Sequence, residues 1–147
     1  MHYCDMEPPS HLMASFRPRR DNQIMGLEML SIAVGISSFA KLIAGRNIVV
    51  WSDNTAAEAC TRKGTARSFD HLCIVHALWL RAAELHTELH IRRVPTEVNI
   101  ADDPSREKYS LLDAIARKVP VCKTAAMLDE VFLHSQTWES LSVLGVF

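Results

Sequence analysis

A continuous apolar run over residues 48–51 constrains the fold more than any other stretch of the chain. Its β-branched residues and its position after Gly45 are typical of a strand buried on both faces, as in a parallel or mixed α/β sheet. Asp53, Asn54 and Thr55 follow at its carboxyl end, where each can cap a helix. Ligands gather at this end of a strand in open α/β folds. A carboxylate buried there is costly unless it caps a helix or faces a cation or metal.

Size and composition indicate one compact unit. The chain has 147 residues, 48% of them hydrophobic, which is enough for one domain with a core and too little for two ordinary ones. No apolar run reaches the roughly 18 residues that span a bilayer, so no membrane partner is predicted. The four cysteines form no CxxC pair and the amino terminus lacks the order of a secretion signal, which favours an intracellular protein with reduced thiols.

Helices are predicted on both sides of this strand. A long helix over about 21–43 has nearly continuous apolar residues and is therefore expected to be buried on most sides. A short helix over 55–63 should end at Gly64. A third helix is predicted over about 68–86, with its apolar residues at helical spacing on one side. The pattern is that of an α/β domain in which helices flank a sheet.

The domain organisation follows from the remaining segments. Residues 89–94 alternate in part and predict a half-exposed strand, and a polar turn with two adjacent acids follows at 98–106. The core is therefore predicted over 21–109. Residues 1–20 are expected to be irregular, and residues 110–147 to form a helical carboxy-terminal extension of the same domain that packs over the core.

Three acidic positions occur where this order can bring them to one edge of the sheet. Glu28 lies in the middle of the first helix, Asp53 at the strand end, and Asp102 or Asp103 just past the next strand. Glu28 faces either solvent or the sheet near Asp53. Converging carboxylates repel one another unless cations hold them, and Mg²⁺ or Mn²⁺ suits oxygen ligands. Two such ions about 4 Å apart can activate a water and stabilise the leaving oxygen of a phosphodiester.

Three stretches, 23–30, 49–57 and 93–106, carry short motifs in a fixed order. They resemble, respectively, the "qI..lE…A" helix, the "sDN.tA" strand end and the "vP…N.AD.lSR" stretch of the ribonuclease H-like domain of retroelement reverse transcriptases. The resemblance covers roughly residues 20–109. It implies a ribonuclease H-like mixed sheet with flanking helices, and two-metal hydrolysis of the RNA strand of RNA–DNA hybrids with Mg²⁺ or Mn²⁺.

The resemblance also assigns roles to individual residues. Glu28, Asp53 and Asp102 match the family's catalytic metal ligands. Asp103 stands where the family usually has an apolar residue, so Asp102 is the preferred ligand of the two. Asn99 is expected to brace the acidic turn.

The chain departs from the family before the first helix. The family has an aspartate on a first strand, then two more strands, all ahead of the glutamate helix, but only 27 residues precede Glu28 here. Asp5 lies too close to Glu28 to leave room for those strands. The chain thus resembles an amino-terminally truncated domain, which is a metal-dependent endonuclease only if its site is complete. The strand over 48–51 would also lack its family neighbour, and we expect the amino-terminal segment, a second copy or a partner chain to cover this edge.

Basic residues near these motifs offer contacts to a nucleic-acid backbone, although ordinary solvated loops have the same composition. The candidate nucleic-acid-binding residues are Asn54, Arg62, Lys63, Arg67 and Arg106. Arg92, Arg93 and Lys108 can extend this basic surface around the acidic turn. A second hypothesis, from a different class, is a non-catalytic, domesticated remnant that acts as a binding or oligomerisation module. The missing first strands favour this hypothesis for the chain in isolation.

Overall fold

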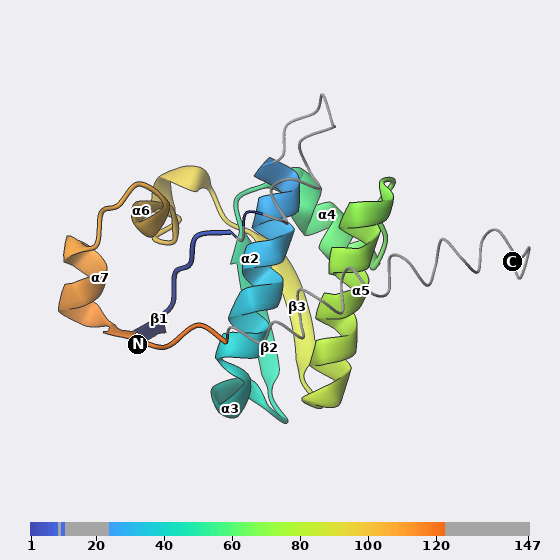
Figure 1. Ribbon diagram of the computed structural model, residues 1–147, viewed down its shortest axis with the longest axis horizontal. Helices are drawn as coiled ribbons and strands as arrows, with labels where there is room; N and C mark the ends of the chain where they lie inside the picture. Colours follow the sequence, from blue (N-terminus) through green and yellow to red (C-terminus); the bar gives the residue numbers. More distant parts are fainter. Residues whose placement is uncertain (9, 11–23, 123–147) are drawn as a thin grey trace, which may run out of the picture.

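The computed structural model describes residues 1–8, 10 and 24–122, which form a mixed α/β fold with two small parallel sheets (Figure 1). The elements in chain order are β1 His2–Tyr3, α2 Ile24–Ser38, α3 Ala40–Ile43, β2 Asn47–Ser52, α4 Thr55–Lys63, α5 Phe69–Glu84, β3 Glu88–Arg93, the 3-10 turn η1 Thr96–Val98, α6 Asp102–Ser105, α7 Ser110–Ile115 and β4 Arg117–Lys118. Each helix and strand predicted between residues 24 and 116 is present. The helical pieces predicted beyond residue 122 lie outside the described residues. In the described ranges no helix combines the length and apolarity needed to cross a membrane.

The β2–β3 pair forms the centre of the fold. The two strands run parallel with Asn47 opposite Glu88 and Ser52 opposite Arg93, so their carboxyl ends lie together. The ladder continues by one bond, in which the Val94 amide donates to the Ser52 carbonyl at 3.0 Å. Parallel strands need a crossover connection, and α4 and α5 supply it.

The expectation that the strand over 48–51, which is β2, is buried on both faces is wrong for the described structure. Ile48 and Val50 pack against the core, but Val49 and Trp51 are 47% and 58% exposed. Successive side chains of a strand point to opposite faces, and only one face of β2 lies against the core. The unbroken apolar run therefore includes two side chains that the described residues leave on an open face.

The core lies between the sheet and two long helices. α2 packs against α5, and the two lie side by side in Figure 1. The side chains at their contact are almost fully buried and include Met29, Ile74, Val75 and Leu78. Burial of α2 on most sides is confirmed. The predicted helix over 21–43 is interrupted at Phe39, and its predicted start lies outside the described residues.

The short helix α4 has the boundaries that its sequence predicts. The Asn54 side chain accepts hydrogen bonds from the amides of Ala56 and Ala57, each at 3.0 Å, and so caps the amino terminus. Gly64 ends the helix with φ +70°, a left-handed conformation that glycine adopts at low cost. Because Asn54 provides the cap, the Asp53 carboxylate is not needed for it.

The amino-terminal segment forms a second small unit with the residues after α6. β1 pairs in parallel with β4, which corrects the expectation that residues 1–20 are irregular throughout. Asp5 fixes this pairing, since it lies 2.6 Å from the Lys118 ammonium and accepts a hydrogen bond from the Tyr109 hydroxyl at 2.9 Å. In the described part of the chain β1 therefore does not pair with β2, and β2 has β3 as its single strand partner.

Candidate acidic site

The three predicted acids are placed by three separate elements. Asp53 is the first residue after β2, and Asp102 is the first residue of α6, beyond β3 and η1. Glu28 lies on α2, and all three side chains are partly buried. Since the carboxyl ends of β2 and β3 lie at the same edge of the sheet, the residues that follow them are held on that side of the molecule.

The electrostatics of Glu28 show that Asp53 and Asp102 both act on its carboxyl group. The pKa of the Glu28 carboxyl is raised above its ordinary value, first by burial and then by the negative charges of Asp53 and Asp102. A carboxylate on a solvated helix face would not meet both effects. The structure thus favours the alternative in which Glu28 faces the sheet near Asp53. Of the two acids in the turn, Asp102 and not Asp103 contributes to the raised pKa of Glu28.

The turn before Asp102 is held by Asn99, as the resemblance implies. The Asn99 side-chain amide donates to Asp102 Oδ1 at 3.2 Å, while its own oxygen accepts from the Ala101 amide at 3.3 Å. The Asp102 amide also donates to the Asn99 carbonyl at 3.1 Å. On the other side Arg106 lies 3.6 Å from Asp102 Oδ2 in a largely exposed ion pair, which contributes little to stability. These bonds fix the backbone position of Asp102.

A raised pKa at Glu28 predicts a defined dependence of stability on pH. The folded state holds the Glu28 proton more tightly than the unfolded chain, so this stabilising contribution is complete below the unfolded pKa and is lost as the pH rises through the folded pKa. Glu28→Gln removes the charge, and the variant should be more stable than the wild type at pH 7. Urea unfolding across pH should show this difference disappear near pH 4.

The matched control for that experiment is Glu97→Gln, which changes an exposed glutamate in η1. It should leave the shape of the stability–pH curve unchanged. If Glu28→Gln and Glu97→Gln give the same curve, Glu28 does not lie in the environment described above.

The carboxylates have the chemistry of a Mg²⁺ or Mn²⁺ site, but they do not form a closed one. Among the residues that the structure describes, no group of three His, Cys, Asp or Glu side chains is arranged so that it could hold a metal ion. The donor set nevertheless consists of oxygens alone. Burial is the largest cause of the raised pKa of Glu28, and a bound cation would relieve the repulsion from Asp53 and Asp102 that adds to it. Mg²⁺ is commonly held by one or two carboxylates together with substrate phosphates.

Asp5 does not complete this acidic set. Its carboxylate is paired with Lys118, whose hydrogen bond is the main cause that lowers the pKa of Asp5, and it also accepts the Tyr109 bond. It is not among the charges that raise the pKa of Glu28. This agrees with the expectation that Asp5 is not a substitute for the family's first aspartate.

The predicted basic residues are spread along α4 and the acidic turn. Asn54 begins α4 beside Asp53, whereas Arg62 and Lys63 are in its last turn, about 12 Å further along the helix axis. Arg62 pairs with Glu58 at 3.4 Å, and both Lys63 and Arg67 are exposed. Arg106 is the predicted basic residue that contacts one of the acids. The structure therefore joins Arg106 to the acidic site and places Arg62 and Lys63 at a distance from it.

Comparison of the chain with protein families, with curated proteins and with solved structures found no match.

Proposed function

We propose that the chain is a ribonuclease H-like domain of the kind found in retroelement reverse transcriptases, and that its acidic site binds an RNA–DNA hybrid. The main support is the effect of Asp53 and Asp102 on Glu28, because the charges of a strand end and of a later turn both reach a half-buried carboxyl on a helix. The parallel β2–β3 pair, whose inner face packs in one core cluster with residues of α2 and α5, also supports the proposal. The three motifs lie on α2, on β2 with the start of α4, and on the stretch from the end of β3 through α6.

In this proposal the residues of the chain position the nucleic-acid backbone. Asn99 and Arg106 hold Asp102 in place, while Asn54 fixes the start of α4 next to Asp53. Glu28, Asp53 and Asp102 would hold Mg²⁺ or Mn²⁺ together with phosphate oxygens, and the bound ion would supply positive charge that stabilises a phosphodiester under attack. Lys63 and Arg67 are exposed and free to follow the phosphates further along the hybrid.

Hydrolysis of the RNA strand by two metal ions is proposed only for a complete site. The described residues form no group that could hold a metal without help from a ligand, and Asp5 is engaged by Lys118. For this chain alone we therefore propose binding of the hybrid without cleavage. The proposed location is intracellular, in the cytoplasm or nucleus, which agrees with four cysteines that are not joined in disulfides.

The test is a comparison of binding and cleavage on the same substrates. Fluorescence anisotropy with labelled RNA–DNA hybrid and with duplex DNA, each with and without Mg²⁺, should show Mg²⁺-dependent binding that favours the hybrid. Gel analysis of the same samples should show an intact RNA strand. Equal affinity for both duplexes, or no binding to the hybrid at all, would contradict the proposed function.

The open side of β2 favours a second candidate function, that of an oligomerisation or partner-binding module. Val49 and Trp51 are exposed, and β2 has one strand partner among the described residues. Sheet edges without a partner are sites of strand addition from another chain. Light scattering should then give a mass above that of one 16.5 kDa chain, and amide exchange should be slow along β2. A monomer in which the amides of residues 49–51 exchange freely would exclude this candidate.

A further inference from the structure

A groove lies along β3, beside α4 and α5, and shares none of its residues with the acidic site. Its volume is about 500 Å³, within the range of roughly 300–1,000 Å³ typical of small-molecule sites. The lining residues are Glu58, Arg62, Trp79, Leu89, His90, Ile91, Arg92 and Arg93. Five of these are consecutive residues of β3, so the groove runs along the strand rather than into the core.

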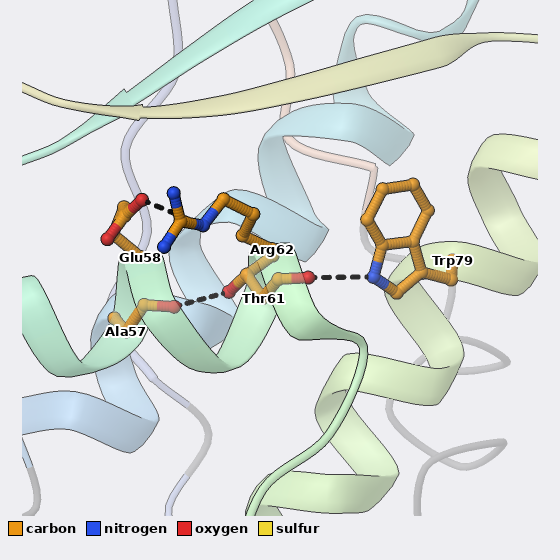
Figure 2. Close-up of polar contacts among 5 residues, drawn as sticks. All are labelled: Ala57, Glu58, Thr61, Arg62 and Trp79. Atoms are coloured by element: carbon orange, nitrogen blue, oxygen red, sulfur yellow. Dashed lines mark hydrogen bonds and ion pairs between the residues drawn. The ribbon is translucent and has the colours of Figure 1, made fainter.

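The side chains from the two helices are fixed on one side of this groove. Figure 2 shows Arg62 and Trp79 extending from α4 and α5 toward the strand that passes above them. The Trp79 Nε1–H donates to the Thr61 carbonyl at 2.9 Å, and Glu58 lies 3.4 Å from Arg62 Nε (Figure 2). Because the polar end of the indole is occupied by this bond, a ligand would meet the apolar ring.

The charge of the groove selects an anionic ligand. Arg62, Arg92 and Arg93 line it, and the one acid beside them is Glu58. Arginine binds phosphate through its planar, multiple donors, and an aromatic ring accepts a nucleobase by stacking. An anion that carries a flat, apolar group therefore suits both features.

We propose that this groove binds a single strand of nucleic acid, with phosphates at Arg62 and Arg92 and an unpaired base on Trp79. A base within a duplex is stacked on its neighbours and has no free face for the indole. The groove is also too small to enclose a duplex, whereas one or two unpaired nucleotides match its volume. A single strand needs only phosphate contacts and a stacking platform, and these are what the lining residues offer.

The position of the groove suggests where such a strand comes from. Its Arg93 end is opposite Ser52, the residue directly before Asp53. A strand that lies in the groove would thus lead toward the acidic edge, as the unpaired overhang of a bound hybrid would. The inference rests on the proposed function in taking the partner to be nucleic acid.

The experiment measures binding of labelled oligothymidine and oligouridine, roughly ten nucleotides long, to the full chain in EDTA. Arg62→Gln and Arg92→Gln should each weaken binding about tenfold and reduce the slope of log K against log salt by about 0.7. The matched control is Arg46→Gln, an exposed arginine outside the groove, which should stay within about twofold of the wild type. Binding should also shift the indole N–H resonance of Trp79, assigned with Trp79→Phe.

Several outcomes would overturn the inference. One is that Arg62→Gln and Arg92→Gln both bind the oligonucleotides with wild-type affinity. Another is that the indole N–H resonance of Trp79 does not shift when the protein is saturated with oligonucleotide. Equally effective competition by polyglutamate of the same charge would show that the groove responds to negative charge alone. If the hybrid still binds in these cases, only the groove assignment fails. If neither hybrid nor single strand binds, the proposed function fails with it.

Discussion

Replacing Leu78 by alanine is expected to lower the free energy of unfolding by about 2–5 kcal/mol. Leu78 is 1% exposed and lies on α5 at its contact with α2. The substitution removes buried methyl groups and leaves a cavity that the well-packed neighbours, Met29 and Ile74 among them, fill only in part. A domain of this size has a total stability of about 5–15 kcal/mol. Urea unfolding followed by circular dichroism should therefore show a midpoint shift large enough to approach loss of the fold.

The same helix provides the control for this substitution. Leu80 is two positions further along α5 and is 54% exposed. Leu80→Ala removes the same atoms from the surface and should change stability by about 0.5 kcal/mol or less. Similar losses in both variants would mean that α5 does not present Leu78 to α2.

Neutralising the three acids together is expected to strengthen binding of the RNA–DNA hybrid when no divalent cation is present. In the variant that combines Glu28→Gln, Asp53→Asn and Asp102→Asn, three charges that repel phosphate are removed. Each such charge contributes about 0.5–1 kcal/mol through solvent at contact distances, so affinity in EDTA should rise roughly ten- to a hundredfold. Added Mg²⁺ should strengthen wild-type binding and leave the variant unchanged. Fluorescence anisotropy at fixed ionic strength measures both effects.

A second triple variant separates a local effect from a change in net charge. Glu7→Gln, Glu84→Gln and Glu107→Gln change three exposed acids outside the acidic site and alter the net charge by the same amount. This variant should show a small gain in affinity and keep the response to Mg²⁺. If the two triple variants behave alike, the acidic site does not face the hybrid.

The elements that the sequence predicts well are those whose signals are local. Asn54 and Gly64 lie at the two ends of α4, where a cap side chain and a positive φ determine the boundaries within a few residues. The position of β2 follows from a short apolar run, and that of β3 from partial alternation of apolar and polar residues. The proximity of Glu28 to Asp53 was one of two alternatives, and it needed one further step, namely that the helix before the strand faces the sheet.

Features that depend on distant residues were not predicted. The exposure of Val49 and Trp51 depends on which elements cover each face of the sheet, and the apolar run itself carries no such information. The interruption at Phe39 coincides with a bond from the Cys122 amide to the Ser38 hydroxyl at 3.0 Å, across 84 positions. Trp79 packs against the core as a partly buried side chain, and it also lines the groove along β3, which its helical spacing does not indicate.

Some of the residues that line the groove carry a signal in the sequence, but the groove itself does not. Glu58 and Arg62 are four residues apart on a helix, a spacing at which opposite charges pair. Arg92 and Arg93 were candidates for nucleic-acid contact. No local pattern, however, places α4 beside β3, because the two are separated by the whole of α5.

The most direct test is a site-resolved titration of the Glu28 carboxyl carbon by NMR, because the proposed acidic site depends on the convergence of Glu28, Asp53 and Asp102. In the wild type the pKa of Glu28 should lie above its ordinary value, and it should fall toward that value in both Asp53→Asn and Asp102→Asn. Asp103→Asn is the control and should leave the pKa of Glu28 unchanged. A Glu28 pKa that is the same in all four proteins would contradict the convergence of the three acids, and with it the proposed acidic site.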